Sequence, residues 1–133
     1  MDTGQCIRDS TSNHKSWLPA KRSTIDWFYW PRYRRFLELV KGWPGKVVAT
    51  LDTVSDDILD LIGDPQSNTN WQRRGLVLGS VQSGKTATYT SLVNKAADAG
   101  YKVIIILTGT IENLRKQTQE RLDIEFALSL IHI

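Results

Sequence analysis

The sequence predicts an α/β fold in which helices cover a parallel sheet, and two apolar runs with the segment between them carry this prediction. The first run, "GLVL" at residues 75–78, leads into a glycine-containing loop that a helical pattern follows. The second run, "KVIIIL" at residues 102–107, is rich in β-branched residues, as is typical of a strand covered on both faces. A strand, a helix and a second strand in this order predict parallel pairing with a right-handed crossover.

Composition limits the class of protein. The chain has 133 residues, of which 41% are apolar and 23% are charged, as in an ordinary globular domain. Its single cysteine, Cys6, excludes an internal disulfide framework, which suits a reducing compartment. The N-terminus lacks the character of a secretory signal, and no apolar run approaches the roughly 20 residues of a membrane helix. We therefore expect a soluble, cytoplasmic protein with no membrane partner.

Changes in composition divide the chain into the regions 1–24, 25–70, 71–127 and 128–133. The first is polar and without periodicity, and we expect a loose leader. The second is expected to be a small helical lead-in. Its segment "WFYWPRYRRFLELV" places Pro31 in a first helical turn and apolar residues at helical spacing. These aromatic residues either form the buried face of an amphipathic helix, which we favour, or stack on nucleic-acid bases.

Charge is unevenly distributed, although the net charge is only +3. Residues 14–46 are basic, residues 52–64 carry aspartates without a base, and residues 71–122 are basic again. Such blocks form either a polyanion-binding surface or solvated faces.

The rest of the lead-in predicts one more helix. "GWPG" at residues 42–45 ends the first helix. "KVVATL" at residues 46–51 is a candidate strand or an extended connection. Thr53 and Asp56 then have the spacing of a capping box, and an apolar stripe follows them as far as Gly63, which stops the helix.

Two helices are expected in the third region. Residues 86–98 form the first, and Gly100 is expected to end it in a left-handed conformation. Residues 110–122 form the second, directly after the second apolar run. The side chains expected to face the core from the first of these helices are Tyr89, Leu92, Val93, Ala96 and Ala97.

The loop after the first apolar run carries a phosphate-binding motif. Residues 79–86 match the pattern G-x-x-x-x-G-K-[S/T] at every fixed position, between a strand pattern and a helix pattern. Glycines allow backbone N–H groups to turn towards phosphate oxygens, the lysine reaches the β- and γ-phosphates, and the threonine hydroxyl binds Mg²⁺. The residues expected to bind a nucleoside triphosphate are Gly79, Ser80, Val81, Gln82, Ser83, Gly84, Lys85 and Thr86. Lys85 and Thr86 are the expected catalytic residues, with Mg²⁺ on Thr86.

The segment from residue 73 to residue 123 resembles the N-terminal ATPase segment of the Z-one domain endonucleases. These bacterial proteins join a superfamily-two helicase core to an endonuclease-associated domain and often occur near restriction or defence genes. A weaker similarity reaches back to about residue 30. The residues that carry the resemblance are Gly75, residues 81–86, Ala96, Gly100, Tyr101, Leu107, Gly109, Leu114, Arg115 and residues 117–123.

The resemblance implies a RecA-like P-loop NTPase sheet, with ATP and Mg²⁺ bound at the motif. It also implies that the chain is the N-terminal part of a DNA-dependent, helicase-like motor of an endonuclease. DNA and other proteins of a defence operon are the implied partners. The residues that would face the DNA strand are Thr108, Gly109, Thr110 and Arg115.

The acid that holds Mg²⁺ in such enzymes is missing from its usual place after an apolar strand. Thr108 and Gly109 follow the second run, whereas Asp123 and Glu125 follow a helix. We therefore expect an incomplete sheet in a fragment of a longer protein, and we interpret residues 128–133 as a tail foreign to the family. A small-molecule kinase and a nucleotide-binding regulatory module without turnover remain as alternatives.

Overall fold

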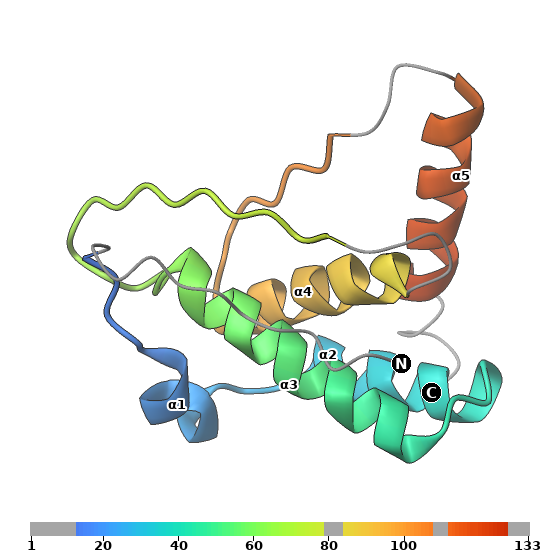
Figure 1. Ribbon diagram of the computed structural model, residues 1–133, viewed down its shortest axis with the longest axis horizontal. Coiled ribbons are helices and arrows are strands. Elements are labelled where there is room, and N and C mark those ends of the chain that lie inside the picture. Colours follow the sequence, from blue (N-terminus) through green and yellow to red (C-terminus); the bar gives the residue numbers. More distant parts are fainter. Residues whose placement is uncertain (1–12, 79–83, 108–111, 128–133) are drawn as a thin grey trace.

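A computed structural model of the chain describes residues 13–78, 84–107 and 112–127 (Figure 1). Within these residues every regular element is helical and no strand is present, so the predicted α/β fold with a P-loop parallel sheet is wrong. The α-helices are α1 (Leu18–Lys21), α2 (Tyr29–Arg35), α3 (Gly45–Ile62), α4 (Lys85–Ala99) and α5 (Glu112–Leu122). A 3₁₀ turn η1 (Arg22–Thr24) follows α1, and the π-helical turns η2 (Phe36–Val40) and η3 (Asp123–Ala127) continue α2 and α5.

The two apolar runs expected to be central strands belong to no sheet in the described part of the chain. Both are irregular segments, without helix or strand (Figure 1). Leu76, Leu78 and Leu107 are 81%, 83% and 90% exposed. A central parallel strand requires neighbours on both edges and helices over both faces, and two strands alone are marginal in water. The described helices cover neither run. The two segments therefore lack the tertiary contacts that would stabilise them as strands.

Residues 46–51, a candidate strand in the sequence, form the first turns of α3 instead. Pro44 precedes the helix with an extended ψ of 139°, and a proline before the first turn suits a helix start. Val48, Leu51, Ser55 and Leu59 are buried, and their spacing of three and four residues is that of one helical face. This periodicity outweighs the strand propensity of the two valines.

The other helix predictions are confirmed in outline, but the buried face of α4 is not the expected one. Gly100 ends α4 in a left-handed conformation, with φ of 104°. Of the side chains expected to face the core, only Ala96 is buried. The buried face instead carries mostly polar side chains. Besides Ala96, its residues are Ala87, Thr90, Ser91, Asn94, Lys95 and Ala99. Within the described residues no sheet covers the apolar face, and α4 packs its opposite side against α2 and α3.

The segment 13–24 differs from the expected loose leader, whose residues 1–12 lie outside the described part. Trp17 and Leu18 are buried against α3. The Asp60 carboxylate of α3 accepts hydrogen bonds from the backbone N–H groups of both residues at 2.8 Å. The Asp60 carboxylate and the buried side chains of Trp17 and Leu18 thus hold this polar segment on α3.

The core forms where α2, α3 and α4 meet. The predicted burial of the aromatic face of α2 is confirmed, because Trp30 and Tyr33 are only 4% and 0% exposed. Asp98 of α4 accepts hydrogen bonds from the N–H groups of Phe28, Tyr29 and Trp30 and so caps α2. The main cluster consists of Trp30, Tyr33, Phe36, Leu37, Val48, Leu51 and Ala87. Because Ala87 belongs to this cluster, the cluster holds the first turn of α4 beside α2.

Candidate functional site

The described part of the phosphate-binding motif forms the start of α4. Gly84 is the N-cap residue and has a left-handed backbone, with φ of 82° and ψ of 23°, a conformation that suits glycine. Lys85 is the first helical residue and is exposed, and Thr86 is partly buried. The other motif residues lie outside the described part of the chain and are Gly79, Ser80, Val81, Gln82 and Ser83.

This helix start has the electrostatic character of an anion site. The first N–H groups of a helix have no partner within it, and the helix dipole places positive charge there. α4 is 15 residues long, and no described side chain caps its N-terminus. The first turn of α4 therefore presents backbone donors and, on Lys85, a cation.

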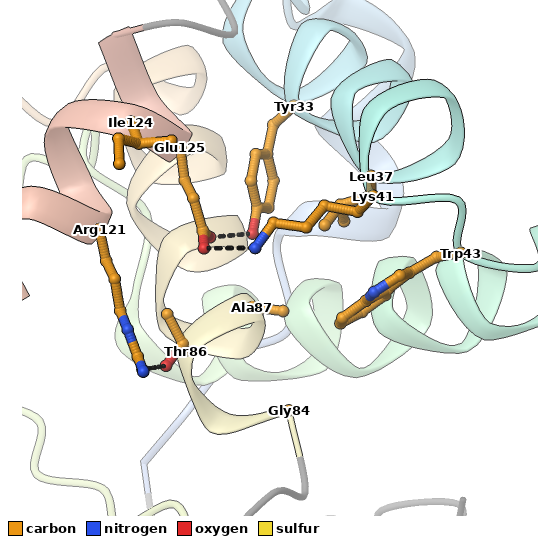
Figure 2. Close-up of a pocket in the computed structure, with 10 residues that line it drawn as sticks. All are labelled: Tyr33, Leu37, Lys41, Trp43, Gly84, Thr86, Ala87, Arg121, Ile124 and Glu125. Atoms are coloured by element: carbon orange, nitrogen blue, oxygen red, sulfur yellow. Dashed lines mark hydrogen bonds and ion pairs between the residues drawn. The ribbon is translucent and has the colours of Figure 1, made fainter.

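A cavity of about 320 Å³ lies beside the start of α4, which is near the lower end of the range for small-molecule sites. Figure 2 shows that its walls come from α2 and η2, from the loop before α3, from α4, and from the junction of α5 with η3. The lining residues are Tyr33, Leu37, Lys41, Trp43, Gly84, Thr86, Ala87, Arg121, Ile124 and Glu125. Apolar side chains form part of the wall, and charged groups converge on the rest.

Arg121, at the end of α5, contacts the motif at the cavity. Its Nη1 donates a hydrogen bond to the hydroxyl of Thr86 at 2.9 Å (Figure 2). A guanidinium matches the geometry of a phosphate group and carries a permanent positive charge. The contact therefore adds a second cation, besides Lys85, near the N-terminus of α4.

Glu125 also lines the cavity, one helical turn beyond Arg121. The Tyr33 hydroxyl donates to its Oε2 at 2.8 Å, and the Lys41 ammonium lies 3.4 Å from its Oε1 (Figure 2). Burial raises the pKa of Tyr33 above its ordinary value, and the negative charge of Glu125 raises it further. Tyr33 therefore remains a hydrogen-bond donor at all ordinary pH values, and Glu125 is held by a neutral donor and a cation.

Of the four residues expected to face DNA, the structure describes only Arg115. Thr108, Gly109 and Thr110 lie outside the described residues. Arg115 is exposed on α5 and does not line the cavity. Among the predicted site residues that the structure describes, Gly84 and Thr86 line the cavity, whereas Lys85 and Arg115 do not.

Arg121 and Glu125 were not assigned a role from the sequence. One signal was available, because residues four apart on a helix share a face and these two flank the end of the predicted second helix. Arg121 contacts Thr86, 35 residues away, and Glu125 contacts Tyr33, 92 residues away. Both contacts depend on how α5 and η3 pack against α4 and α2. No local sequence pattern predicts this packing of distant helices.

Comparison of the chain with protein-family models, with curated proteins and with solved structures finds no match. Within the described ranges, no three His, Cys, Asp or Glu side chains gather as a metal-binding group. None of the described helices has the length and apolar character needed to span a membrane. Function therefore has to be inferred from the residues around the start of α4.

Proposed function

We propose that the chain binds ATP and Mg²⁺ at the start of α4, as the N-terminal part of a DNA-dependent, helicase-like ATPase. The motor would belong to an endonuclease of a bacterial restriction or defence system, acting on DNA in the cytoplasm, with other defence proteins as partners. The observation that carries the proposal is the left-handed Gly84, which starts a 15-residue helix at Lys85 and sets the Thr86 hydroxyl at the edge of a cavity.

The residues present suit a triphosphate with its metal ion. Backbone donors at a helix start bind phosphate oxygens, and Lys85 and Arg121 add positive charge. The Thr86 hydroxyl oxygen has two acceptor positions, and Arg121 donates to the group. One position is left for Mg²⁺, which prefers oxygen ligands. When bound, Mg²⁺ neutralises part of the phosphate charge.

Phosphoryl transfer to water requires little covalent chemistry from a protein. Its residues orient the phosphates and stabilise the charge that develops on the transferred group. Lys85 and Arg121 are suited to this role because both place a positive charge near the start of α4, where the phosphates would lie. Hydrolysis would then drive closure around DNA or movement along it.

The DNA part of the proposal is supported by the resemblance and by the exposed basic side chain of Arg115 on α5. Contacts of this kind to phosphate position a strand without reading its sequence. Binding should therefore weaken as salt is added.

Replacing Lys85 by alanine is expected to weaken ATP binding roughly tenfold or more, because one charge-assisted phosphate contact of about 1.5–3 kcal/mol is lost. The test uses the complete reading frame and measures ATP hydrolysis with and without duplex DNA. Hydrolysis by the unaltered protein should rise with DNA and be lost in Lys85→Ala. Lys102→Ala is the matched control, since Lys102 is exposed beyond the other end of α4. Hydrolysis that is indifferent to DNA would exclude the motor.

Arg121→Ala is expected to weaken ATP binding by roughly tenfold, again through the loss of a charged hydrogen-bond donor. Arg121→Lys should fall between the two proteins, because lysine keeps the charge without the planar fork. Arg115→Ala serves as the comparison and should lower DNA affinity without changing ATP affinity. Equal ATP affinity in Arg121→Ala and the unaltered chain would remove Arg121 from the site.

A further inference from the structure

Glu125 is an acid in the same cavity as the motif threonine. Glu125 is only 6% exposed, and burial of a carboxylate is costly unless the group is paired. Thr86 of α4 and Glu125 of η3 both line the cavity (Figure 2). The sequence pattern left the motif without an acid because none follows an apolar strand. The fold supplies one from a helical turn.

The other acids near this end of the chain do not have this position. Asp123 is exposed and accepts a hydrogen bond from Gln119 at 2.8 Å. Glu112 pairs with Lys116 at 3.6 Å, on the surface of α5. Among the acids of the described residues, Glu125 is the one that lines the cavity.

Glu125 is held in place and still has acceptor capacity. Tyr33 binds one carboxylate oxygen and Lys41 approaches the other, whereas an ionised carboxylate offers about four acceptor positions. The Lys41 side chain is 44% exposed, so its ammonium has solvent and phosphate as alternative partners. The remaining positions on Glu125 are available to water molecules in the cavity.

Mg²⁺ usually keeps several of its waters and is bound through one or two carboxylates together with substrate phosphates. We propose that Glu125, which lines the same cavity as the Thr86 hydroxyl, would help to hold the Mg²⁺ of the bound nucleotide by accepting from water on the ion. This inference rests on the proposed function, because the ion arrives with the nucleotide. Tyr33 is then a positioning residue that orients the carboxylate, as partners of metal-binding groups commonly do.

The test measures equilibrium binding of a fluorescent ATP analogue by the full chain over a range of Mg²⁺ concentrations and in EDTA. Glu125→Gln keeps the shape of the side chain and an acceptor for Tyr33 but removes the charge. We expect this variant to need roughly tenfold more Mg²⁺ to reach half of the metal-dependent gain in affinity. In EDTA it should bind the analogue as well as the unaltered chain, which also shows that it is folded. Should it fail to fold, Glu125→Asp, which retains a carboxylate on a shorter stem, is expected to give an intermediate Mg²⁺ requirement.

Two matched variants separate a metal-binding role from a structural one. Asp123→Asn removes a carboxylate two residues away in the same turn and should leave the Mg²⁺ dependence unchanged. Tyr33→Phe removes the hydrogen bond to Glu125 but not its charge, so it should shift the Mg²⁺ dependence less than Glu125→Gln.

The outcomes also separate this inference from the proposed function. The same Mg²⁺ dependence in Glu125→Gln and the unaltered chain would overturn the role of Glu125 and leave nucleotide binding intact. Failure of the unaltered chain to bind the analogue would overturn both. An unchanged Mg²⁺ requirement in Glu125→Asp, measured in place of an unfolded Glu125→Gln, would likewise contradict the inference.

Discussion

Replacing both Asp52 and Asp56 by asparagine is expected to lower the free energy of unfolding by roughly 3–5 kcal/mol, because the ammonium of Lys95 is left buried without a carboxylate. The side chain of Lys95 is 0% exposed. Its Nζ donates to Oδ1 of Asp52 and to Oδ1 of Asp56, each at 2.5 Å. It also donates to the backbone carbonyl of Asp52 at 2.8 Å.

Removing the lysine should cost less than removing its partners. In Lys95→Met the two aspartates keep Arg22, whose guanidinium lies 3.1 Å from Asp52 and 2.7 Å from Asp56. Their side chains are also 19% and 22% exposed, so water solvates them in part. The methionine stem retains apolar contact with Trp30, over whose ring the ammonium lies at 4.4 Å.

Denaturant unfolding followed by circular dichroism measures this difference. The triple variant, with both asparagines and Lys95→Met, should recover much of the lost stability, because no buried charge is left unpaired. Asp57→Asn is the control, since Asp57 is a partly exposed aspartate on the same helix. A larger loss in Lys95→Met than in the double asparagine variant would contradict the proposed asymmetry.

The same network explains why the orientation of α4 could not be predicted from the sequence. The helix itself was predictable, since its glycine caps and apolar spacing are local signals. From the sequence alone, a lysine at position 95 is expected to face solvent, because its carboxylate partners are distant in the chain. Those partners, Asp52 and Asp56, are 43 and 39 residues away. The apolar spacing in α4 therefore predicted the wrong face of the helix to be buried.

The strand prediction failed for a related reason. The composition of residues 103–107 favours a strand, but strand formation depends on neighbours that a local pattern does not supply. The start of α4 was predictable because the motif fixes a glycine and a helix within a few residues. The cavity walls at Arg121 and Glu125 depend on the packing of distant helices, so only the motif half of the candidate site was available from the sequence.

Removing the Asp60 carboxylate is expected to detach the segment 13–24 from α3 and to cost roughly 2–4 kcal/mol, since two buried N–H groups lose their acceptor. Asp60 is 3% exposed. Its Oδ1 accepts from the N–H groups of Trp17 and Leu18 at 2.8 Å each, and from the Ser16 hydroxyl at 3.2 Å. Asp60→Ala should show the full loss, and Asp26→Ala, which alters an exposed aspartate, should show little.

The contribution of Asp60 should also depend on pH. Burial raises the pKa of the Asp60 carboxyl, but the hydrogen bonds from Leu18 and Trp17 outweigh it and hold the pKa below the ordinary value of 3.8. A depressed pKa in the folded chain means that the stabilisation is complete above the unfolded value and is lost as the pH falls through the folded value. Asp64, whose pKa is also lowered, contributes in the same direction. The free energy of unfolding, measured from pH 6 downwards, should therefore fall below about pH 4, and the fall should be smaller in Asp60→Asn. An equal fall in both proteins would show that the carboxylate of Asp60 does not hold this segment on α3.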